Sequence, residues 1–492
     1  MLSLARSIKN SFASISRIPP EVLSLIAHHC DEDEDLITLT HVCRSWREIF
    51  TSHASLWTNL DCADVEKTSV YLERSKASPL DIYVEEEDFV NEAFLLTVPH
   101  LGRLGSLTLR GSSDDLPELT KHLRPPAPFL KKLALAGIGA EPPVLQQTFF
   151  NDDLSSLQEL RLEGVIVRLA WESMSNLRMV NLIDIPSDEM SVTQLLDFFE
   201  HAPLLRKIRL DGTFPNFCDA QRGRRVALPN LKFLIIDAKP AHIILTSHLL
   251  IPEGATINQT LTFTEIRSPI LSHLPSTFEY FKNLSHISSI NLDFYCGAYM
   301  RLDGPTGALY MYGDWDGEGS TATGVDRRVL HSLNPFPICT VERLAIRYWR
   351  SATAPPIENS SIYNTFLHMS NLRTLRLTRC FNLPFASALN PKKNPSGTVL
   401  CPKLEELIMY IHKEGWFCIE ELSAMTKARI SRGAKLETIK IVSTHELAPT
   451  REVLKLRAYV SHVEYRLDNI VPVWDAIRDD PNDPGDAGDE SD

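Results

Sequence analysis

Histidine and cysteine side chains gather near the start of the chain, where their chemistry suits a metal ion. His28, His29 and Cys30 are consecutive, and His41 and Cys43 follow a short distance later. Imidazole and thiolate groups are the ligands that zinc prefers. Adjacent residues point to different faces of a helix, so His28 and His29 cannot both face one ion. The spacing therefore predicts no metal site at this end of the chain.

A second group of potential ligands lies in the stretch "GDWDGEGS". Asp314, Asp316 and Glu318 are acids at alternate positions, which loosely resembles a calcium loop. No glutamate closes a loop of twelve residues, as the usual calcium loop requires. A glycine-rich hairpin tip, with "ALYMY" as one strand, is the interpretation that the sequence favours.

Sequence motifs of known catalytic chemistry are absent. The chain has no G-x-x-x-x-G-K-[ST], no H-E-x-x-H, no G-x-S-x-G and no dinucleotide-type glycine pattern after a strand. We therefore expect no enzyme activity and no cofactor. An active site assembled from residues distant in sequence is the alternative that a motif search leaves open.

Composition narrows the class of protein. With 492 residues, 43% of them hydrophobic, the chain exceeds one compact domain. No apolar stretch approaches the roughly 18 residues of a membrane span. No segment has a sustained lysine and arginine excess, so we expect neither nucleic acid nor a membrane as a partner. The nine cysteines include no C-x-x-C pair, which favours a reducing compartment, cytoplasm or nucleus.

The two ends of the chain differ from the rest. The formal net charge is -13, and residues 479–492 hold seven acids and no base. This composition cannot bury apolar surface, so we expect disorder over 471–492. Residues 1–15 carry Arg6 and Lys9 and no acid, which predicts a disordered arm. An organelle-targeting leader is the alternative.

Short amphipathic helices are predicted in the first sixty residues. After Pro19 and Pro20, Val22, Leu25, Ile26 and His29 recur at helical spacing. Asp35 is placed to cap a second helix, whose apolar positions are Leu36, Leu39, Cys43, Trp46 and Phe50. Helices this short are marginal without packing partners. Their apolar faces must be buried against something else.

The same residues resemble the F-box pattern, in which L-P-x-E opens the motif and V-C-x-x-W-R closes it. The matching positions are Ile18-Pro19, Glu21, Val22, Ile26, Asp35-Leu36, Val42-Cys43-Arg44, Trp46-Arg47 and Leu56-Trp57. The resemblance implies docking onto the Skp-type linker subunit of a cullin-RING ubiquitin ligase. The linker contacts that it implies are Ile18, Pro19, Val22, Leu25, Ile26, Leu36, Leu39, Val42, Cys43, Trp46 and Trp57.

Some positions depart from that pattern. Ala27 and Cys30 stand where the family usually has bulkier apolar residues, and the acidic loop is about one residue longer. A smaller buried area would weaken docking by roughly 1 to 2 kcal/mol. A simple cap on the rest of the chain is the alternative interpretation of these helices.

The remainder of the chain repeats a short pattern, L-x-x-L-x-L. It occurs as "LGSLTL" at 104, "LKKLAL" at 130, "LQELRL" at 157, "LRMVNL" at 177, "LRKIRL" at 205, "LKFLII" at 231, "ISSINL" at 287, "VERLAI" at 341, "LRTLRL" at 372, "LEELIM" at 404 and "LETIKI" at 436. Alternation of apolar and polar residues predicts a strand with one buried face. Helical stripes lie between the strands, as in "SVTQLLDFFEHAP".

Strand and helix units of this period resemble a leucine-rich-repeat solenoid. We therefore expect an α/β fold with an F-box at 16–60, a linker helix at 61–78 and repeats over 79–470. The repeats contain an insertion at about 296–340. The segment from Ser55 to Val84 also resembles those of fungal F-box proteins. Gly111, Gly137, Gly164 and Gly212 each follow the last apolar strand residue by two positions, which predicts a sharp turn at each.

One row of residues between the apolar strand positions is predicted to line a concave face. It comprises Thr108, Ala134, Arg161, Asn181, Arg209, Ile235, Asn291, Ala345, Arg376, Ile408 and Lys440. Its four basic members, Arg161, Arg209, Arg376 and Lys440, suggest a site for an acidic or phosphorylated degron. The alternative is ion pairing with neighbours such as Glu159, Glu163 and Asp211.

The function that these patterns favour is a substrate receptor of an SCF-type ubiquitin ligase. The N-terminal motif would bind the linker, and the repeats would bind a protein to be ubiquitinated. A leucine-rich-repeat scaffold with a degenerate F-box and no role in degradation is the alternative.

Overall fold

The structure is a computed structural model of the whole chain. It describes residues 14–29, 33–85, 90–145, 148–186, 191–212, 223–238, 245–246, 248–263, 286–294, 297–304, 308–315, 330, 333, 336–348, 359–378, 383–411, 419–443 and 455–467.

The chain forms two compact units, Met1–Pro252 and Glu253–Asp492. The helices of the first unit are α2 (Pro20–Ala27), α3 (Asp33–His41), α4 (Arg44–Ser52), α5 (Val65–Ser75), α6 (Val90–Thr97), α7 (Asp115–Thr120) and α8 (Val192–His201). The repeats predicted over 79–470 have strands in both units.

Three short helices open the first unit. Pro19 caps α2, and Pro20 occupies its first turn, where a missing N–H costs no hydrogen bond. The sequence predicts one helix from Asp35 to Phe50, but the chain forms α3 and α4 with a break at Val42 and Cys43. Cys43 has extended backbone and caps α4. Asp35 lies inside α3 and is not its cap.

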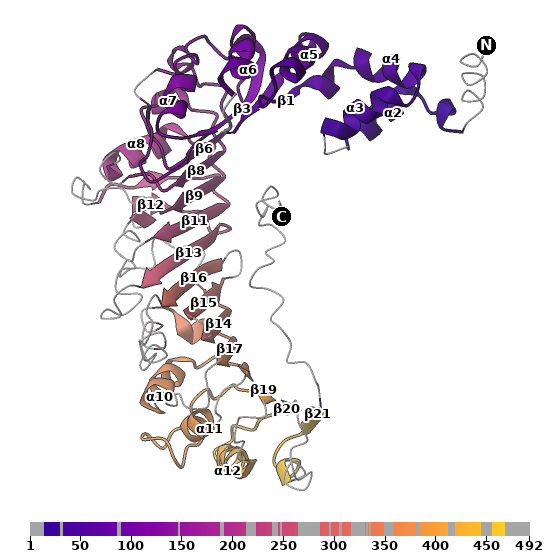
Figure 1. The fold of residues 1–492 in the computed structure, drawn as a ribbon. Helices are drawn as coiled ribbons and strands as arrows, with labels where there is room; N and C mark the ends of the chain where they lie inside the picture. The colour runs from indigo at the N-terminus through magenta and orange to yellow at the C-terminus, as the bar shows by residue number, and fades with distance from the viewer. Residues whose placement is uncertain are drawn as a thin grey trace. The chain divides into compact units, whose positions relative to one another are not determined.

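The sheet of the first unit is parallel. Its strands are β1 (Asn59–Asp61), β2 (Leu80–Val84), β3 (Leu104–Gly111), β4 (Lys132–Gly137), β6 (Glu159–Glu163), β8 (Met179–Ile183), β9 (Lys207–Asp211) and β11 (Phe233–Ala238). Each pairs with the next in this order. Figure 1 shows β3 to β11 stacked in sequence order, with α7 and α8 on one side. Two short pairs join β5 (Val144–Leu145) to β7 (Ile166–Val167) and β10 (Val226–Ala227) to β12 (Leu249–Leu250).

The predicted alternation sets the core of this sheet. In β8, Val180 and Leu182 are buried while Met179, Asn181 and Ile183 are half-buried. The helix predicted in "SVTQLLDFFEHAP" is α8, whose Ser191 and Gln194 form a reciprocal capping box. Val192, Leu195, Leu196 and Phe199 are buried. The apolar strand positions and this helix face therefore form one core.

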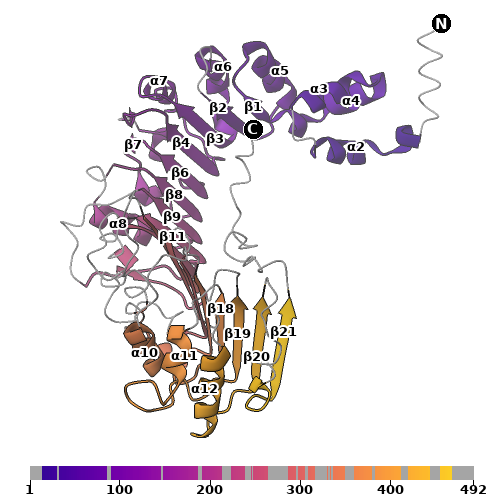
Figure 2. The ribbon, with the colours of Figure 1, turned by 60° about the horizontal axis from the view of Figure 1, so that its bottom comes forward.

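The second unit contains a mixed sheet. Its strands are β13 (Thr256–Phe263), β14 (Ser289–Phe294), β15 (Gly297–Asp303), β16 (Ala308–Trp315), β17 (Arg343–Tyr348), β18 (Thr374–Thr378), β19 (Glu406–Ile411), β20 (Thr438–Ser443) and β21 (His462–Leu467). The run from β14 through β17 to β21 is parallel, as Figure 2 shows for β18 to β21. The helices are α10 (Asn359–His368), α11 (Leu383–Leu389) and α12 (Ile419–Ile430).

The predicted insertion at 296–340 contributes strands to this sheet. Within it, β15 pairs antiparallel with both β14 and β16, and β16 pairs parallel with β13. The "ALYMY" segment is part of β16, as expected. Asp314 also lies in β16, whereas Asp316 and Glu318 fall outside the described residues.

The predicted glycine turns hold at two of four positions. Gly164 and Gly212 adopt φ of +54° and +56°, in the region that glycine favours. Gly111 and Gly137 are instead the last residues of β3 and β4, and neither has a positive φ. Asp184 takes the equivalent place after β8 with φ of +50°. The turn therefore does not require glycine.

Among the residues that the structure describes, none of the helices combines the length and the apolar character needed to cross a bilayer.

Candidate functional site

Helix α2 carries apolar residues on two faces. Leu23, Ser24 and Ala27 are buried, and α2 contacts α4. The opposite side chains, Val22, Leu25 and Ile26, are 43%, 61% and 48% exposed. These three residues lie at i, i+3 and i+4, so they share one face of the helix. This face is a surface that α2 does not bury within the chain.

Helix α3 and the break that follows it add to the exposed apolar surface. Val42, at the break between α3 and α4, is 56% exposed, and Ile37 of α3 is more than one-third exposed. We refer to Val22, Leu25, Ile26, Ile37 and Val42 as the exposed apolar set. Single exposed apolar residues are ordinary, but several on α2, α3 and the break after α3 are typical of a protein interaction site.

Hydrogen bonds fix the break that presents Val42. The Nε of Arg47 donates to the carbonyl of Thr40 at 3.0 Å, and the hydroxyl of Thr40 donates to the carbonyl of Ile37 at 2.7 Å. The guanidinium of Arg47 thus satisfies a carbonyl in the last turn of α3, where a cation is favourable. The Arg47 contact joins α4 to α3, and the Thr40 hydroxyl bond closes the last turn of α3.

The remaining predicted linker contacts occupy different environments. Pro19 is exposed, whereas Ile18, Leu39, Cys43 and Trp46 are partly exposed. The Trp46 ring lies edge-on to the buried Phe50 ring, with 5.5 Å between centroids. Trp46 therefore packs on Phe50 within the chain and leaves part of its indole accessible to a partner.

Leu36 and Trp57 are buried, which corrects their assignment to the linker-contacting residues. The indole Nε1 of Trp57 donates to the carbonyl of Phe50 at 2.8 Å. Its ring meets that of Tyr71 edge-on at 4.9 Å and lies 4.3 Å from the guanidinium carbon of Arg74. Trp57 thus joins α4 to α5 and presents no surface to a partner.

Two exposed residues were missed from the sequence. Ile15 and Ile37 are among the exposed large apolar residues of this region. Ile37 lies directly after Leu36, and adjacent residues point to different faces of a helix, so the apolar stripe through Leu36 does not include Ile37. Ala27, which departs from the F-box pattern, is buried on the inner face of α2. It therefore removes no apolar area from the exposed face.

The predicted concave row is a true structural row within each unit. Pairing connects Thr108, Ala134, Arg161, Asn181, Arg209 and Ile235 in the first unit. It connects Asn291, Ala345, Arg376, Ile408 and Lys440 in the second. The four basic residues are therefore two pairs on separate units.

Each of these four basic side chains has a partner within the chain. Arg161 pairs with Glu163 and Arg209 with Asp211, both at 2.9 Å. Lys440 pairs with Glu406 at 2.8 Å, and its hydrogen bond to that carboxylate raises the pKa of Lys440. The Arg376 guanidinium lies over the Tyr410 ring at 4.7 Å. These contacts favour the ion-pairing alternative, and the degron site stays a prediction.

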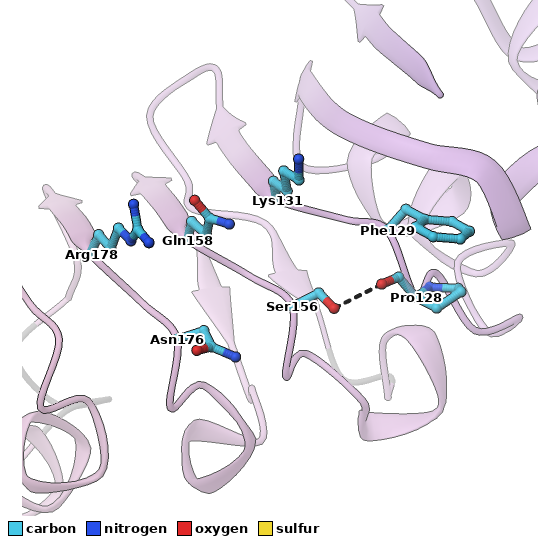
Figure 3. Close-up of a pocket in the computed structure, with 7 residues that line it drawn as sticks. All are labelled: Pro128, Phe129, Lys131, Ser156, Gln158, Asn176 and Arg178. Carbon is cyan, nitrogen blue, oxygen red and sulfur yellow. Dashed lines mark hydrogen bonds between the residues drawn. The ribbon is translucent and has the colours of Figure 1, made fainter. Parts of the chain in front are cut away.

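A small pocket lies at the amino-terminal edge of the first sheet. It measures about 290 Å³ and is lined by Pro128, Phe129, Lys131, Ser156, Gln158, Asn176 and Arg178. Figure 3 shows Lys131, Gln158 and Arg178 side by side ahead of their strands, with Pro128 and Phe129 at one end. Sequence reasoning did not identify this pocket, because its residues come from three separate repeats.

Histidine, cysteine and acidic side chains are spread over the described part of the chain. No cluster of three or more His, Cys, Asp or Glu side chains there is placed to hold a metal ion. His28 instead lies 3.1 Å from the hydroxyl of Ser55 through its Nε2. Cys30 lies outside the described residues.

Comparison with known proteins bears on the N-terminal helices alone. No curated protein matches the chain. The F-box-like family model matches residues 15–63, a range that contains α2, α3, α4 and the exposed apolar set. F-box-like domains suggest substrate-adaptor roles in SCF-type ligases in general. The match over residues 15–63 therefore supports an F-box protein.

Proposed function

We propose that this chain is the substrate-receptor subunit of an SCF-type cullin-RING ubiquitin ligase. Its exposed apolar set binds the Skp-type linker protein, and its two units bind a target protein. The chain itself catalyses no reaction and contributes proximity, by holding the target near a charged ubiquitin-conjugating enzyme.

The observation that carries this proposal is the unburied face of α2. Full burial of a leucine, isoleucine or valine side chain contributes about 1.5 to 3 kcal/mol. Val22, Leu25 and Ile26 leave much of that contribution unused within the chain. The F-box-like match covers these same residues. A partner groove of apolar character would supply the missing burial.

The repeated strands support the second half of the proposal. Parallel strands that pair with their sequence neighbours in constant register, with helices between several of them, are consistent with a leucine-rich-repeat-like solenoid. Such a solenoid presents an extended surface of stacked side chains to another protein. Stacked rows of side chains run along the strands of each unit.

The test is the affinity of the purified chain for a Skp-type linker protein, measured by titration calorimetry. We expect Leu25→Ser with Ile26→Ser to weaken binding about 100-fold or more, since central apolar contacts of an interface each contribute about 1 to 2 kcal/mol or more. Both side chains are exposed, so the melting temperature should not fall.

A matched control uses exposed leucines outside the F-box-like match. Leu204 and Leu367 are 39% and 48% exposed. Their replacement by serine should leave linker affinity within about twofold. Equal loss in both double variants, or absence of binding by the folded wild-type chain, would refute the linker contact. Reconstituted ligase with the wild-type chain should also ubiquitinate a bound protein that the Leu25 and Ile26 variant leaves unmodified.

A further inference from the structure

The first sheet brings basic side chains together at its amino-terminal edge. Lys131, Gln158, Arg178, Arg206 and Lys232 each immediately precede a strand. Backbone hydrogen bonds of 2.7 to 2.8 Å join each of them to the next. We call these five residues the edge row. Four members are basic and none is acidic, although they lie far apart in the sequence.

Among the residues that the structure describes, the cations of the edge row have no carboxylate partners. Lys131, Arg178, Arg206 and Lys232 are all exposed. Within the described part of the chain, no salt bridge includes any of the four. Lys132 of the adjacent row, by contrast, is paired, because its Nζ lies 3.0 Å from a carboxylate oxygen of Glu159. The edge row therefore presents uncompensated positive charge, unlike Arg161 and Arg209.

The second unit shows that the sheet itself does not require basic residues there. Its corresponding positions are Ser288, Glu342, Arg373, Glu405 and Glu437, joined by backbone hydrogen bonds of 2.8 to 3.0 Å. Arg373 is paired with Glu405 at 3.0 Å. Three acids thus occupy the same structural position. The charge of the edge row is a property of the first unit alone.

The pocket of Figure 3 adds a defined place for one ligand group. Lys131 and Arg178 flank the half-buried Gln158 on consecutive strands. Their ammonium, amide and guanidinium groups are hydrogen-bond donors around one pocket. At its other end lie Pro128 and the largely exposed Phe129 ring. A ligand with an apolar side chain could pack on the Phe129 ring at one end of the pocket. Carboxylates of the same ligand could bind the donors at the other end and along the row.

We propose that the edge row binds an acidic, extended segment of the target protein, with an apolar residue on Phe129 and Asp or Glu side chains along Lys131, Arg178, Arg206 and Lys232. The inference rests on the proposed function and names the class of target segment. Neighbouring strands lie about 4.8 Å apart, so five positions span about 19 Å. This length corresponds to about six residues of extended peptide.

The width of the basic surface favours a peptide over a nucleic acid. The row next to it contains Lys132, Glu159, Met179, Lys207 and Phe233. Only two of these five residues are basic, and one of them, Lys132, is paired with Glu159, so the positive charge is weaker in this row. Nucleic-acid surfaces usually neutralise several phosphates over a broad basic patch. A single row of cations therefore fits one extended peptide better than a nucleic acid.

The test uses the full chain and a fluorescent eight-residue peptide, a leucine followed by alternating Asp and Glu, in polarisation titrations at low salt. We expect Arg178→Glu with Arg206→Glu to weaken binding about tenfold or more, because reversed charges repel the peptide. Added salt should weaken wild-type binding, since these charges are exposed. A peptide with Asn and Gln in place of the acids should not bind.

The matched control is Arg161→Glu with Arg209→Glu, the same change on the same sheet three residues further along the strands. Its affinity should stay within about threefold of wild type. Equal loss in both double variants, or no loss in the edge-row variant, would overturn the assignment. So would tighter binding of a single-stranded oligothymidylate than of the peptide. Removal of residues 479–492 should leave peptide affinity unchanged, and a tenfold gain would show that the chain's own acids occupy the row.

Linker affinity, measured on the same variants, separates this inference from the proposed function. The edge-row variant should bind the Skp-type linker as wild type does. Loss of peptide binding with intact linker binding therefore supports the edge row as a target site. Failure of the peptide to bind a chain that does bind the linker would overturn the edge row and leave the proposed function standing.

Discussion

The N-terminal helices and the repeated strands differ in how far their apolar side chains are buried. In β8, Val180 and Leu182 have no exposed surface, whereas Leu25 of α2 leaves more than half of its surface accessible. Both regions carry a similar density of apolar residues. The strands bury their apolar side chains within the chain, whereas the helices leave several of theirs exposed. Apolar periodicity therefore marks a core in one region and a prospective interface in the other.

The largest expected effect concerns Trp57, which is an exception among the N-terminal residues because it is buried. It belongs to the N-terminal region, yet it is fully buried between Phe50, Tyr71 and Arg74. We expect Trp57→Ala to cost about 3 to 5 kcal/mol of unfolding free energy. Because Trp57 anchors α4, linker affinity should fall as well. Urea unfolding and titration calorimetry measure the two quantities.

A milder substitution provides the control for Trp57. Trp57→Phe keeps an aromatic ring and loses the 2.8 Å hydrogen bond to the Phe50 carbonyl, at a cost of about 1 to 3 kcal/mol for the unpaired buried carbonyl. Unchanged unfolding of Trp57→Ala would contradict the role that the structure gives this residue.

The sharpest form of the comparison applies one chemical change in both regions. Leu182→Ala removes a fully buried side chain from the first sheet and should cost about 2 to 5 kcal/mol. Leu25→Ala removes an exposed side chain and should change stability by less than about 0.5 kcal/mol. Linker affinity should show the opposite order, with about a tenfold loss for Leu25→Ala alone.

Both variants can be followed by urea unfolding and linker titration. Affinity is compared at a temperature at which each variant is folded, so that a stability loss does not appear as a binding loss. If Leu25→Ala destabilised the chain as much as Leu182→Ala, the exposed apolar set would have to be part of a core.

Local patterns predicted the strands well. Each L-x-x-L-x-L segment contains a strand that pairs in the expected order within its unit, because alternation in a short window decides which residues face the core. Strands without that pattern, such as β13 and β21, were missed. The division into two units was missed too, since it depends on contacts between distant segments.

The candidate site was less predictable, for physical reasons. Helical periodicity shows that Val22, Leu25 and Ile26 share a face, but Leu23 and Ala27 make the other face apolar as well. Only packing against α4 decides which face is inside. The apolar residues keep their helical spacing through Cys43 in the sequence, but the helix itself breaks there. The edge row escaped detection because its cations are separated in sequence and meet only through parallel pairing.

The smallest expected effect is a change in thiol reactivity. Burial, assisted by the neighbouring Asp61 charge, raises the pKa of Cys62 to about 12. Burial raises the pKa of Cys401 to about 12 as well. Since only the thiolate reacts, about one in ten thousand of these groups is reactive at pH 8. Cys43 is half-buried before the start of α4, and Cys339 is exposed.

Iodoacetamide labelling with peptide-resolved mass spectrometry extends the comparison to the bound state. In the free chain we expect Cys43 and Cys339 to react, and Cys62 and Cys401 to remain unmodified. A saturating Skp-type linker should slow labelling of Cys43 and leave Cys339 unaffected, because the linker covers only the N-terminal helices. Equal slowing at both positions would indicate a general loss of mobility. Unchanged labelling of Cys43 would show that the linker does not cover the start of α4, and the interface would then be confined to α2.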